Sequence, residues 1–131
     1  MAIFMLDTDT VSFALRGVGA VAARLAKHKR SELCLSAITV AELRFGADKR
    51  RSRKIHQAID AFLSGLDVLA FDNSAAEKFG AIAAALATAG EPIGQMDTLI
   101  AGHSLAVHAT LVTNNQRHFS KVNGLKLENW A

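Results

Sequence analysis

The chain has 131 residues, of which 50% are apolar and 21% charged, and its formal net charge is +3. This length predicts a single domain with its own hydrophobic core, and the composition excludes a disordered or collagen-like chain. The only cysteine is Cys34, which excludes an intrachain disulfide and a cysteine-based metal cluster within one chain.

Strand-length apolar runs alternate with longer helical patterns along the chain. We expect strands over residues 3–6, 33–36, 68–71 and 110–113, with a short fifth over 125–128. We expect helices over residues 8–15, 21–27, 38–47, 50–63 and 96–107, and a long alanine-rich helix that Asp72, Asn73 or Ser74 caps and that ends at Gly90. Pro92 and Gly94 predict a turn before the last helix.

This alternation predicts an α/β fold with a central parallel β-sheet of four to five strands flanked by helices, all within one domain over residues 1–131. The strands are apolar throughout rather than alternating, as expected when both faces of a sheet are covered. In open sheets of this kind, ligands bind beyond the carboxyl ends of the strands, where the strand order reverses.

The beginning of the chain, MAIFMLD, lacks the basic start of a signal peptide, and Asp7 interrupts its apolar run. The apolar stretch of residues 99–116 is broken by glycine, histidine and threonine, which argues against a membrane span. Cys34 lies in the run Leu33–Leu35, which predicts a buried, inert thiol. We therefore expect a cytoplasmic protein with no membrane association.

Three carboxylates stand out by position. Asp7 follows the first strand, where a carboxylate can bind a ligand, although Asp7 or Asp9 could equally cap the next helix. Asp97 lies in the first turn of the last helix, where the helix dipole alone also favours an acid.

Glu42 shares a predicted helix face with Ile38, Ala41 and Phe45, so it is expected to face the sheet. A buried carboxylate needs a partner, and Arg44 is the alternative to a metal.

The predicted topology brings Asp7, Glu42 and Asp97 to one edge of the sheet. Three such carboxylates repel one another, and a hard divalent cation resolves the conflict. Oxygen ligands without histidine or cysteine suit Mg²⁺, for which Mn²⁺ can substitute. We expect Asp7 and Asp97 to bind the ion directly and Glu42 to bind directly or through water.

The segments MLDTDT, SAITVAELRFGADK, FDNSAAEKFGAIAAAL, PIGQMDTLIAGHSLAVHATLVTNNQRHF and GLKLENW together resemble VapC-type toxins, the PIN-domain ribonucleases of bacterial type II toxin–antitoxin pairs. The family's first acid falls on Asp7, the glutamate of its AEL segment on Glu42, and the aspartate after its Pro-Ile-Gly turn on Asp97. The resemblance implies a PIN fold and a Mg²⁺-dependent endoribonuclease that inhibits growth by cutting tRNA or a ribosomal RNA loop. It also implies cleavage that leaves a 5′-phosphate and a 3′-hydroxyl.

The chain departs from the family at the fourth acidic position, where Asn115 and His118 are the candidates. A permanent second metal ion is therefore not expected, because the ions of a two-metal site need bridging charge. Thr8, Thr113 and Asn115 are candidate hydrogen-bonding partners of the ligands. Asp9 is another, although helix capping is its favoured role. His118 is a candidate general acid or a solvated loop residue.

Residues 1–65 carry eleven basic and six acidic side chains, whereas residues 66–131 carry four and six, which favours a polyanionic partner of the first half. Candidate RNA contacts lie in one run, Lys49, Arg50, Arg51, Arg53 and Lys54, whose alternative role is a solvated helix face.

Family resemblance implies a homodimer neutralised by a cognate VapB-type antitoxin, whose tail enters the active-site groove. A receiver-type phosphoacceptor domain, with Asp72 after the third strand, is a competing interpretation. A PIN module that binds RNA without cutting it and a structure-specific DNA nuclease are two others.

Overall fold

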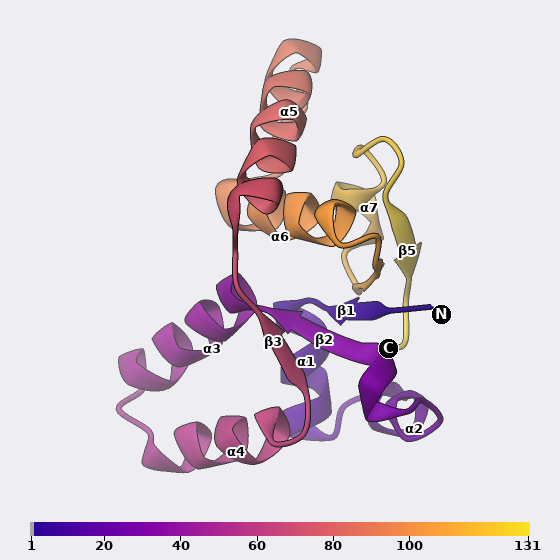
Figure 1. The fold of residues 1–131 in the computed structure, drawn as a ribbon. Coiled ribbons are helices and arrows are strands. Elements are labelled where there is room, and N and C mark those ends of the chain that lie inside the picture. Colours follow the sequence, from indigo (N-terminus) through magenta and orange to yellow (C-terminus); the bar gives the residue numbers. More distant parts are fainter. Residues whose placement is uncertain (1) are drawn as a thin grey trace.

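The computed structural model describes residues 2–131, and its element order alternates strands with helices. Figure 1 shows how these elements are arranged in space. The strands are β1 (Phe4–Leu6), β2 (Leu33–Ser36), β3 (Asp67–Leu69), β4 (Thr110–Val112) and β5 (Lys126–Glu128). The helices are α1 (Thr8–Arg16), α2 (Val21–Leu25), a 3-10 turn η1 (Arg30–Glu32), α3 (Ala37–Lys49), α4 (Arg53–Leu63), α5 (Asn73–Ala89), α6 (Gln95–Ala106) and α7 (Gln116–Phe119).

The five strands form one sheet in the order β3-β2-β1-β4-β5, and every neighbouring pair is parallel. This confirms the predicted parallel α/β architecture. The chain moves outward from β1 to β2 and β3, then crosses back to β4 on the other side of β1. The strand order therefore reverses between β1 and β4, and a ligand site is expected beyond the carboxyl ends of these two strands.

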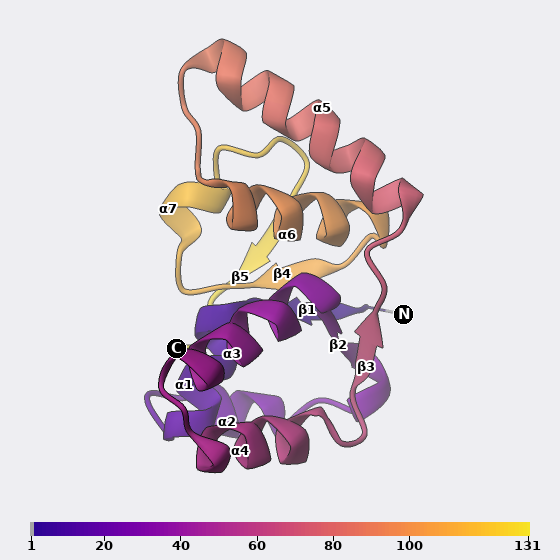
Figure 2. The ribbon, with the colours of Figure 1, turned by 90° about the vertical axis from the view of Figure 1, so that its left-hand side faces the viewer.

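Helices cover both faces of the sheet (Figure 2): α1, α2 and α4 lie on one side, and α6 and α7 on the other. The core is correspondingly divided, because successive strand residues point to opposite faces. Leu6 and Leu35 pack with Ile59 of α4, whereas Met5 and Leu111 pack with Ile100 of α6. Helix α5 packs against α6 and projects away from the body of the molecule.

Local sequence explains where the helices begin and end. Asp7 caps α1 by accepting a hydrogen bond from the Thr10 amide at 2.8 Å, and Asp72 caps α5 through the Ala75 amide at 3.1 Å. Gly17 ends α1 in the left-handed conformation that glycine adopts at no steric cost. Asp9 was favoured as a helix cap in the sequence, and that prediction is wrong because Asp7 performs this role.

The structure also corrects the basic segment. A single helix was expected from about residue 50, but α3 continues to Lys49 and α4 begins only at Arg53. Between them the chain turns through Arg51, whose φ is 49°, and Ser52 caps α4 by accepting from the Ile55 amide.

Two further elements differ from expectation. Strand β3 was expected to be buried, but it is an edge strand whose first two residues are exposed. The short elements η1 and α7 were not predicted. Among residues 2–131, no helix combines the length and apolar character that a membrane crossing requires.

Candidate active site

Asp7 stands directly beyond β1, at the carboxyl edge of the sheet where its strand meets β4. Its amide donates to the carbonyl of Val112 at 3.1 Å, and only 5% of the residue is exposed. Burial raises the pKa of this carboxyl, and hydrogen bonds from Thr113 and Thr10 oppose that rise. Asp7 therefore performs the capping role that was predicted as one alternative, and its carboxyl is buried at the sheet edge; binding of a ligand by this carboxyl stays a prediction.

Glu42 lies half-buried on α3, and its hydrogen-bond partner is Thr8 at the start of α1. The Thr8 hydroxyl donates to Glu42 Oε1 at 2.6 Å. Burial raises the pKa of the Glu42 carboxyl, the Thr8 hydrogen bond lowers it, and the nearby charge of Asp97 raises it further. Arg44 was the alternative partner of Glu42, and that prediction is wrong: Arg44 pairs with Asp60 of α4.

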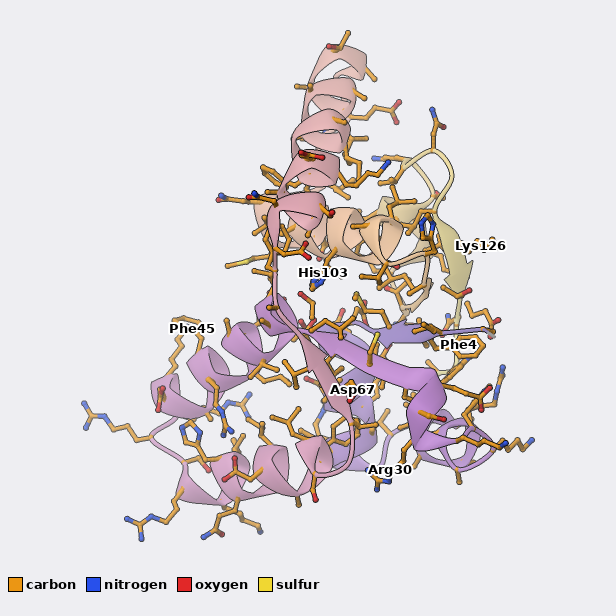
Figure 3. The ribbon with its side chains drawn as sticks, viewed as in Figure 1. Phe4, Arg30, Phe45, Asp67, His103 and Lys126 are labelled. Carbon is orange, nitrogen blue, oxygen red and sulfur yellow. The ribbon has the colours of Figure 1, made fainter. Side chains whose placement is uncertain are left out.

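The predicted face of α3 is also corrected. Ile38, Ala41, Glu42 and Phe45 were expected to face the sheet together, but Phe45 is 67% exposed and projects from the outer side of α3 (Figure 3). The buried side of the helix is formed by Thr39, Leu43 and Ala47. Glu42 therefore lies at the border of the packed face, where its stem is covered and its carboxylate reaches the sheet edge.

Asp97 lies in the first turn of α6, which begins after Gly94 in a backbone conformation with φ 95°. Its Oδ2 is 3.3 Å from Nδ1 of His118. Burial raises the pKa of the Asp97 carboxyl, the contact with His118 lowers it, and the charge of Asp9 raises it. This is the third carboxyl at one sheet edge whose charged form is disfavoured by its surroundings.

One small cavity joins these groups. It has a volume of about 100 Å³, and its lining is mostly polar: Asp7, Thr8, Asp9, Glu42, Asp97 and Asn115. Four carboxylates and no basic side chain line the cavity, and the nearest ring nitrogen is that of His118, which contacts Asp97 at 3.3 Å. The structure thus brings together all three predicted ligands, with Asp9 as a fourth acid.

This donor set fits a hard divalent cation. Oxygen ligands at a cavity large enough to retain water are the environment that Mg²⁺ and Mn²⁺ prefer. A cation would also stabilise the charged forms that burial disfavours. As the side chains stand in residues 2–131, no group of three or more His, Cys, Asp or Glu is placed so that it could hold a metal ion.

Neither of the two candidates for the fourth acidic position, Asn115 and His118, is an acid. The Asn115 side-chain nitrogen lies 2.9 Å from Nδ1 of His118, which in turn contacts Asp97. The backbone amide of Asn115 donates to the Thr113 hydroxyl at 2.9 Å. Asn115 therefore lines the cavity without adding charge, and His118 contacts Asp97 rather than standing free in solvent.

A second, larger cavity of about 570 Å³ adjoins the first and shares Thr8, Asp9 and Glu42 with it. It runs between α1, α3 and α4 as a groove. Its floor is apolar, and its basic residues are Arg16, Arg50 and Lys54.

The groove divides the predicted basic run. Arg50 and Lys54 line it, whereas Lys49, Arg51 and Arg53 are absent from its lining. The Lys49 ammonium instead lies 5.9 Å from the centre of the Phe45 ring. Arg16 was not predicted from the sequence. The spacing Thr8, Ser12, Arg16 on α1 could have revealed it, because residues four apart share one helix face.

Comparison with known proteins identifies the family of the chain. Residues 4–125 match the PIN domain. A protein of Shigella flexneri described as a tRNA(fMet)-specific endonuclease VapC is 38% identical over 129 residues, which cover 98% of each chain. The chain belongs to the VapC ribonucleases of the PIN-domain family. This membership excludes the receiver-type interpretation, and PIN-domain nucleases generally depend on a divalent metal.

Solved VapC-family structures share the whole fold. A DNA-bound VapBC complex from Salmonella typhimurium contains a chain that is 37% identical, with a TM-score of 0.89 and complete coverage of both chains. VapBC2 from Rickettsia felis, bound to a promoter DNA fragment, gives 34% identity and a TM-score of 0.88, over 98% of this chain and 99% of that chain.

Proposed function

We propose that this VapC-family ribonuclease is a cytoplasmic, Mg²⁺-dependent toxin that cuts RNA at the cluster formed by Asp7, Glu42 and Asp97. The observation that carries the proposal is the cavity in which four carboxylates meet without a basic side chain, next to a groove lined by Arg16, Arg50 and Lys54. The acidic cavity supplies cation ligands, and the basic groove supplies contacts for the phosphates of a nucleic acid.

In this mechanism Asp7 and Asp97 would hold the ion, and Glu42 would orient the attacking water and accept its proton. A bound divalent cation neutralises phosphate charge and lowers the pKa of a coordinated water. The water oxygen attacks phosphorus, the bond from phosphorus to the 3′ oxygen breaks, and the leaving oxygen takes a proton from solvent. The products are a 5′-phosphate and a 3′-hydroxyl. The Thr8 hydrogen bond, at 2.6 Å, fixes the orientation of the Glu42 carboxylate.

The substrate class we propose is tRNA, with initiator tRNA first, because the Shigella flexneri relative is described as specific for tRNA(fMet). The chain offers few exposed aromatic side chains near the groove for base stacking, so recognition rests on shape and backbone contacts. Arg16, Arg50 and Lys54 are the proposed phosphate contacts, whereas Lys49, Arg51 and Arg53 form a solvated surface.

We also propose a VapB-type antitoxin as the partner, in a complex built on a homodimer of this chain. Solved relatives from Salmonella typhimurium and Rickettsia felis are VapBC complexes. The larger cavity supports a peptide partner, because its apolar floor ends at Thr8, Asp9 and Glu42. An arginine of the antitoxin placed at that end would pair with the carboxylates and compete with the metal.

The decisive experiment is cleavage of total cellular RNA by purified, antitoxin-free protein. It is run with Mg²⁺ and with excess EDTA, beside the Asp97→Asn variant. We expect a discrete product that requires Mg²⁺ and is lost in the variant, and sequencing of its ends names the target. Cleavage that survives both EDTA and the substitution contradicts the proposal.

Two alternatives are separated in the same experiment. If well-folded protein binds Mg²⁺ and RNA but does not cut, the chain is a binding module, and Asn115 at the fourth acidic position is the feature responsible. A DNA strand of the same sequence as the cut RNA tests the nuclease's choice of substrate. Equal cleavage of both would favour a general nuclease over an RNA-specific toxin.

A further inference from the structure

His103 is a buried titratable side chain that lies outside the acidic cavity. It belongs to α6, is 1% exposed, and projects from that helix toward the sheet (Figure 3). Its Nδ1 lies 2.7 Å from the hydroxyl oxygen of Ser36, the last residue of β2 and the N-cap of α3. The ring also meets Phe71 edge to face, with centroids 5.4 Å apart.

The other hydrogen bond of Ser36 leaves its hydroxyl able to act as the donor to His103. The Ser36 hydroxyl oxygen accepts a hydrogen bond from the Ile38 amide at 3.0 Å, so its single proton is free to be donated. It can therefore donate to Nδ1 of a neutral His103 ring, whose own proton then lies on Nε2. Burial, which lowers the pKa of His103, favours this neutral form.

The hydrogen bond joins the start of α3, which carries Glu42, to α6, which carries Asp97. Ser36 precedes Glu42 by six residues, and His103 follows Asp97 by six. The two helices run in opposite directions, because α3 leads outward from the carboxyl edge of the sheet and α6 leads back over it (Figure 1). Ser36 and His103 therefore meet at one end of the contact between the helices. Glu42 and Asp97 face each other at the other end, about 9 Å away at the helical rise per residue.

The two ends of this contact exert opposite effects. Glu42 and Asp97 carry like charges and repel each other, which drives the helices apart at the cavity. The His103 contact is, among residues 2–131, the one side-chain hydrogen bond that ties α6 to the start of α3. It is buried, so breaking it removes the hydrogen bond of Nδ1 of His103 and leaves the Ser36 hydroxyl with the Ile38 amide alone.

We infer that His103 is a positioning residue whose hydrogen bond to Ser36 clamps α6 to α3 and thereby sets the separation of Asp97 and Glu42 for metal binding. The inference rests on the proposed function, because it assigns to His103 a role in forming the same metal site. It predicts that metal affinity depends on the position of the hydrogen-bond acceptor at residue 103, and not only on the packing of the ring.

The test compares His103→Asn with His103→Gln in the full chain. Asparagine places its side-chain oxygen where Nδ1 stands and can accept from Ser36, whereas glutamine moves the acceptor outward by one methylene group. Both variants lose the ring and its contact with Phe71. Glutamine fills more of the space of the ring than asparagine does, so a packing role alone would make the glutamine variant the better metal binder. Ser104→Ala serves as the control, because it removes a buried hydrogen bond from α6 to the carbonyl of Ala109 and leaves α3 untouched.

The readout is Mn²⁺ affinity, measured by calorimetric titration and by the electron paramagnetic resonance of free Mn²⁺. We expect His103→Gln to bind Mn²⁺ about tenfold more weakly than wild type, and His103→Asn to stay within about threefold. Ser104→Ala should bind as wild type does. Thermal unfolding without metal verifies that each variant is folded.

Equal affinity of the asparagine and glutamine variants overturns the inference, whether both match wild type or both are weakened alike. Asp97→Asn separates this failure from failure of the proposed function. If wild type binds Mn²⁺ and Asp97→Asn does not, the metal site stands and only the role of His103 is rejected. If wild type and Asp97→Asn bind alike, the proposed metal site is wrong and the inference falls with it.

Discussion

Gly102 provides the most quantitative test of how the packing of α5 against α6 supports the site. A Cβ atom added at this position would lie 2.7 Å from the backbone nitrogen of Phe79, 2.9 Å from its Cα, and 3.3 Å from the carbonyl oxygen of Ala75. These neighbours are backbone atoms of α5, which cannot rotate away. To restore ordinary van der Waals contact, α5 and α6 must separate by roughly 0.7 Å.

The predicted cost of Gly102→Ala follows from two opposing terms. Overpacking a close helix contact costs about 1–3 kcal/mol. Replacing glycine by alanine in a helix interior returns about 1 kcal/mol. We therefore expect the variant to lose about 1 kcal/mol of unfolding free energy, and its Tm to fall by roughly 4 °C.

The matched control is Gly80→Ala on α5 itself. Gly80 is exposed, and a Cβ there would meet nothing within 4 Å, so only the helix-propensity gain remains. We expect this variant to gain about 0.5–1 kcal/mol. The assay is thermal and urea-induced unfolding of the metal-free chain, followed by circular dichroism.

Gly102→Ala is expected to lower the free energy of unfolding and Gly80→Ala to raise it, so the two variants should differ clearly. A Gly102→Ala variant as stable as Gly80→Ala would refute the reasoning, because it would mean that the helices have room at their crossing. The site gives a second readout, since Gly102 and Asp97 lie on the same helix. Displacement of α6 should reduce RNA cleavage by Gly102→Ala at temperatures where the variant remains folded, while Gly80→Ala cleaves as wild type does.

Three further predictions follow from the cluster, the C-terminal packing and the thiol. Burial raises the folded-state pKa values of Asp97 and Glu42. The two carboxyls therefore contribute to the free energy of unfolding fully below their ordinary pKa, and this contribution is lost as pH rises through the raised pKa values. In EDTA, urea titrations should therefore show Asp97→Asn gaining stability relative to wild type as pH rises, and added Mg²⁺ should stabilise wild type alone; an unchanging difference would contradict this. Trp130 is buried and stacks on His28 at 4.6 Å, so Trp130→Ala should cost about 3–5 kcal/mol in urea unfolding, and a loss below 1 kcal/mol would mean that the ring is not packed in solution. Burial raises the pKa of Cys34 to about 11, so a thiol reagent at pH 8 should label it only at the rate of unfolding, and immediate labelling would show an accessible thiol.

The sequence was most informative where a side chain's position along a strand or helix determines its surroundings. The apolar runs predicted the parallel sheet. Asp7 and Asp97 were placed correctly at its carboxyl edge, because a residue directly after a strand or in the first turn of a returning helix can lie nowhere else. Their role as metal ligands remains a prediction, since proximity alone does not establish binding.

The errors have physical causes. Periodicity placed Glu42 on one face with Phe45, but a helix at the rim of a sheet buries a narrow stripe, and Phe45 lies outside it. The basic run reads as helix throughout, because lysine and arginine are good helix formers, yet the Ser52 cap and the left-handed Arg51 divide it. The chain continues through similar residues on both sides of that break, so composition alone could not reveal it.

Contacts between residues far apart in the sequence could not be predicted from local sequence patterns. The clamp between His103 and Ser36 joins residues 67 positions apart, and Arg44 finds Asp60 on the next helix. Neither pair has a spacing that identifies it. Only the arrangement of α3, α4 and α6 in space brings these side chains together.

The central position of β1 in the sheet has a consequence for how the chain folds during its synthesis. The backbone amide of Asp7 donates to the carbonyl oxygen of Val112, and the Thr10 hydroxyl, 102 residues away in sequence, donates to the same oxygen. Closing so long a loop is slow, and this pairing cannot form before β4 has been synthesised. A nascent chain therefore cannot complete the contacts that hold Asp7 at the sheet edge until β4 has been synthesised.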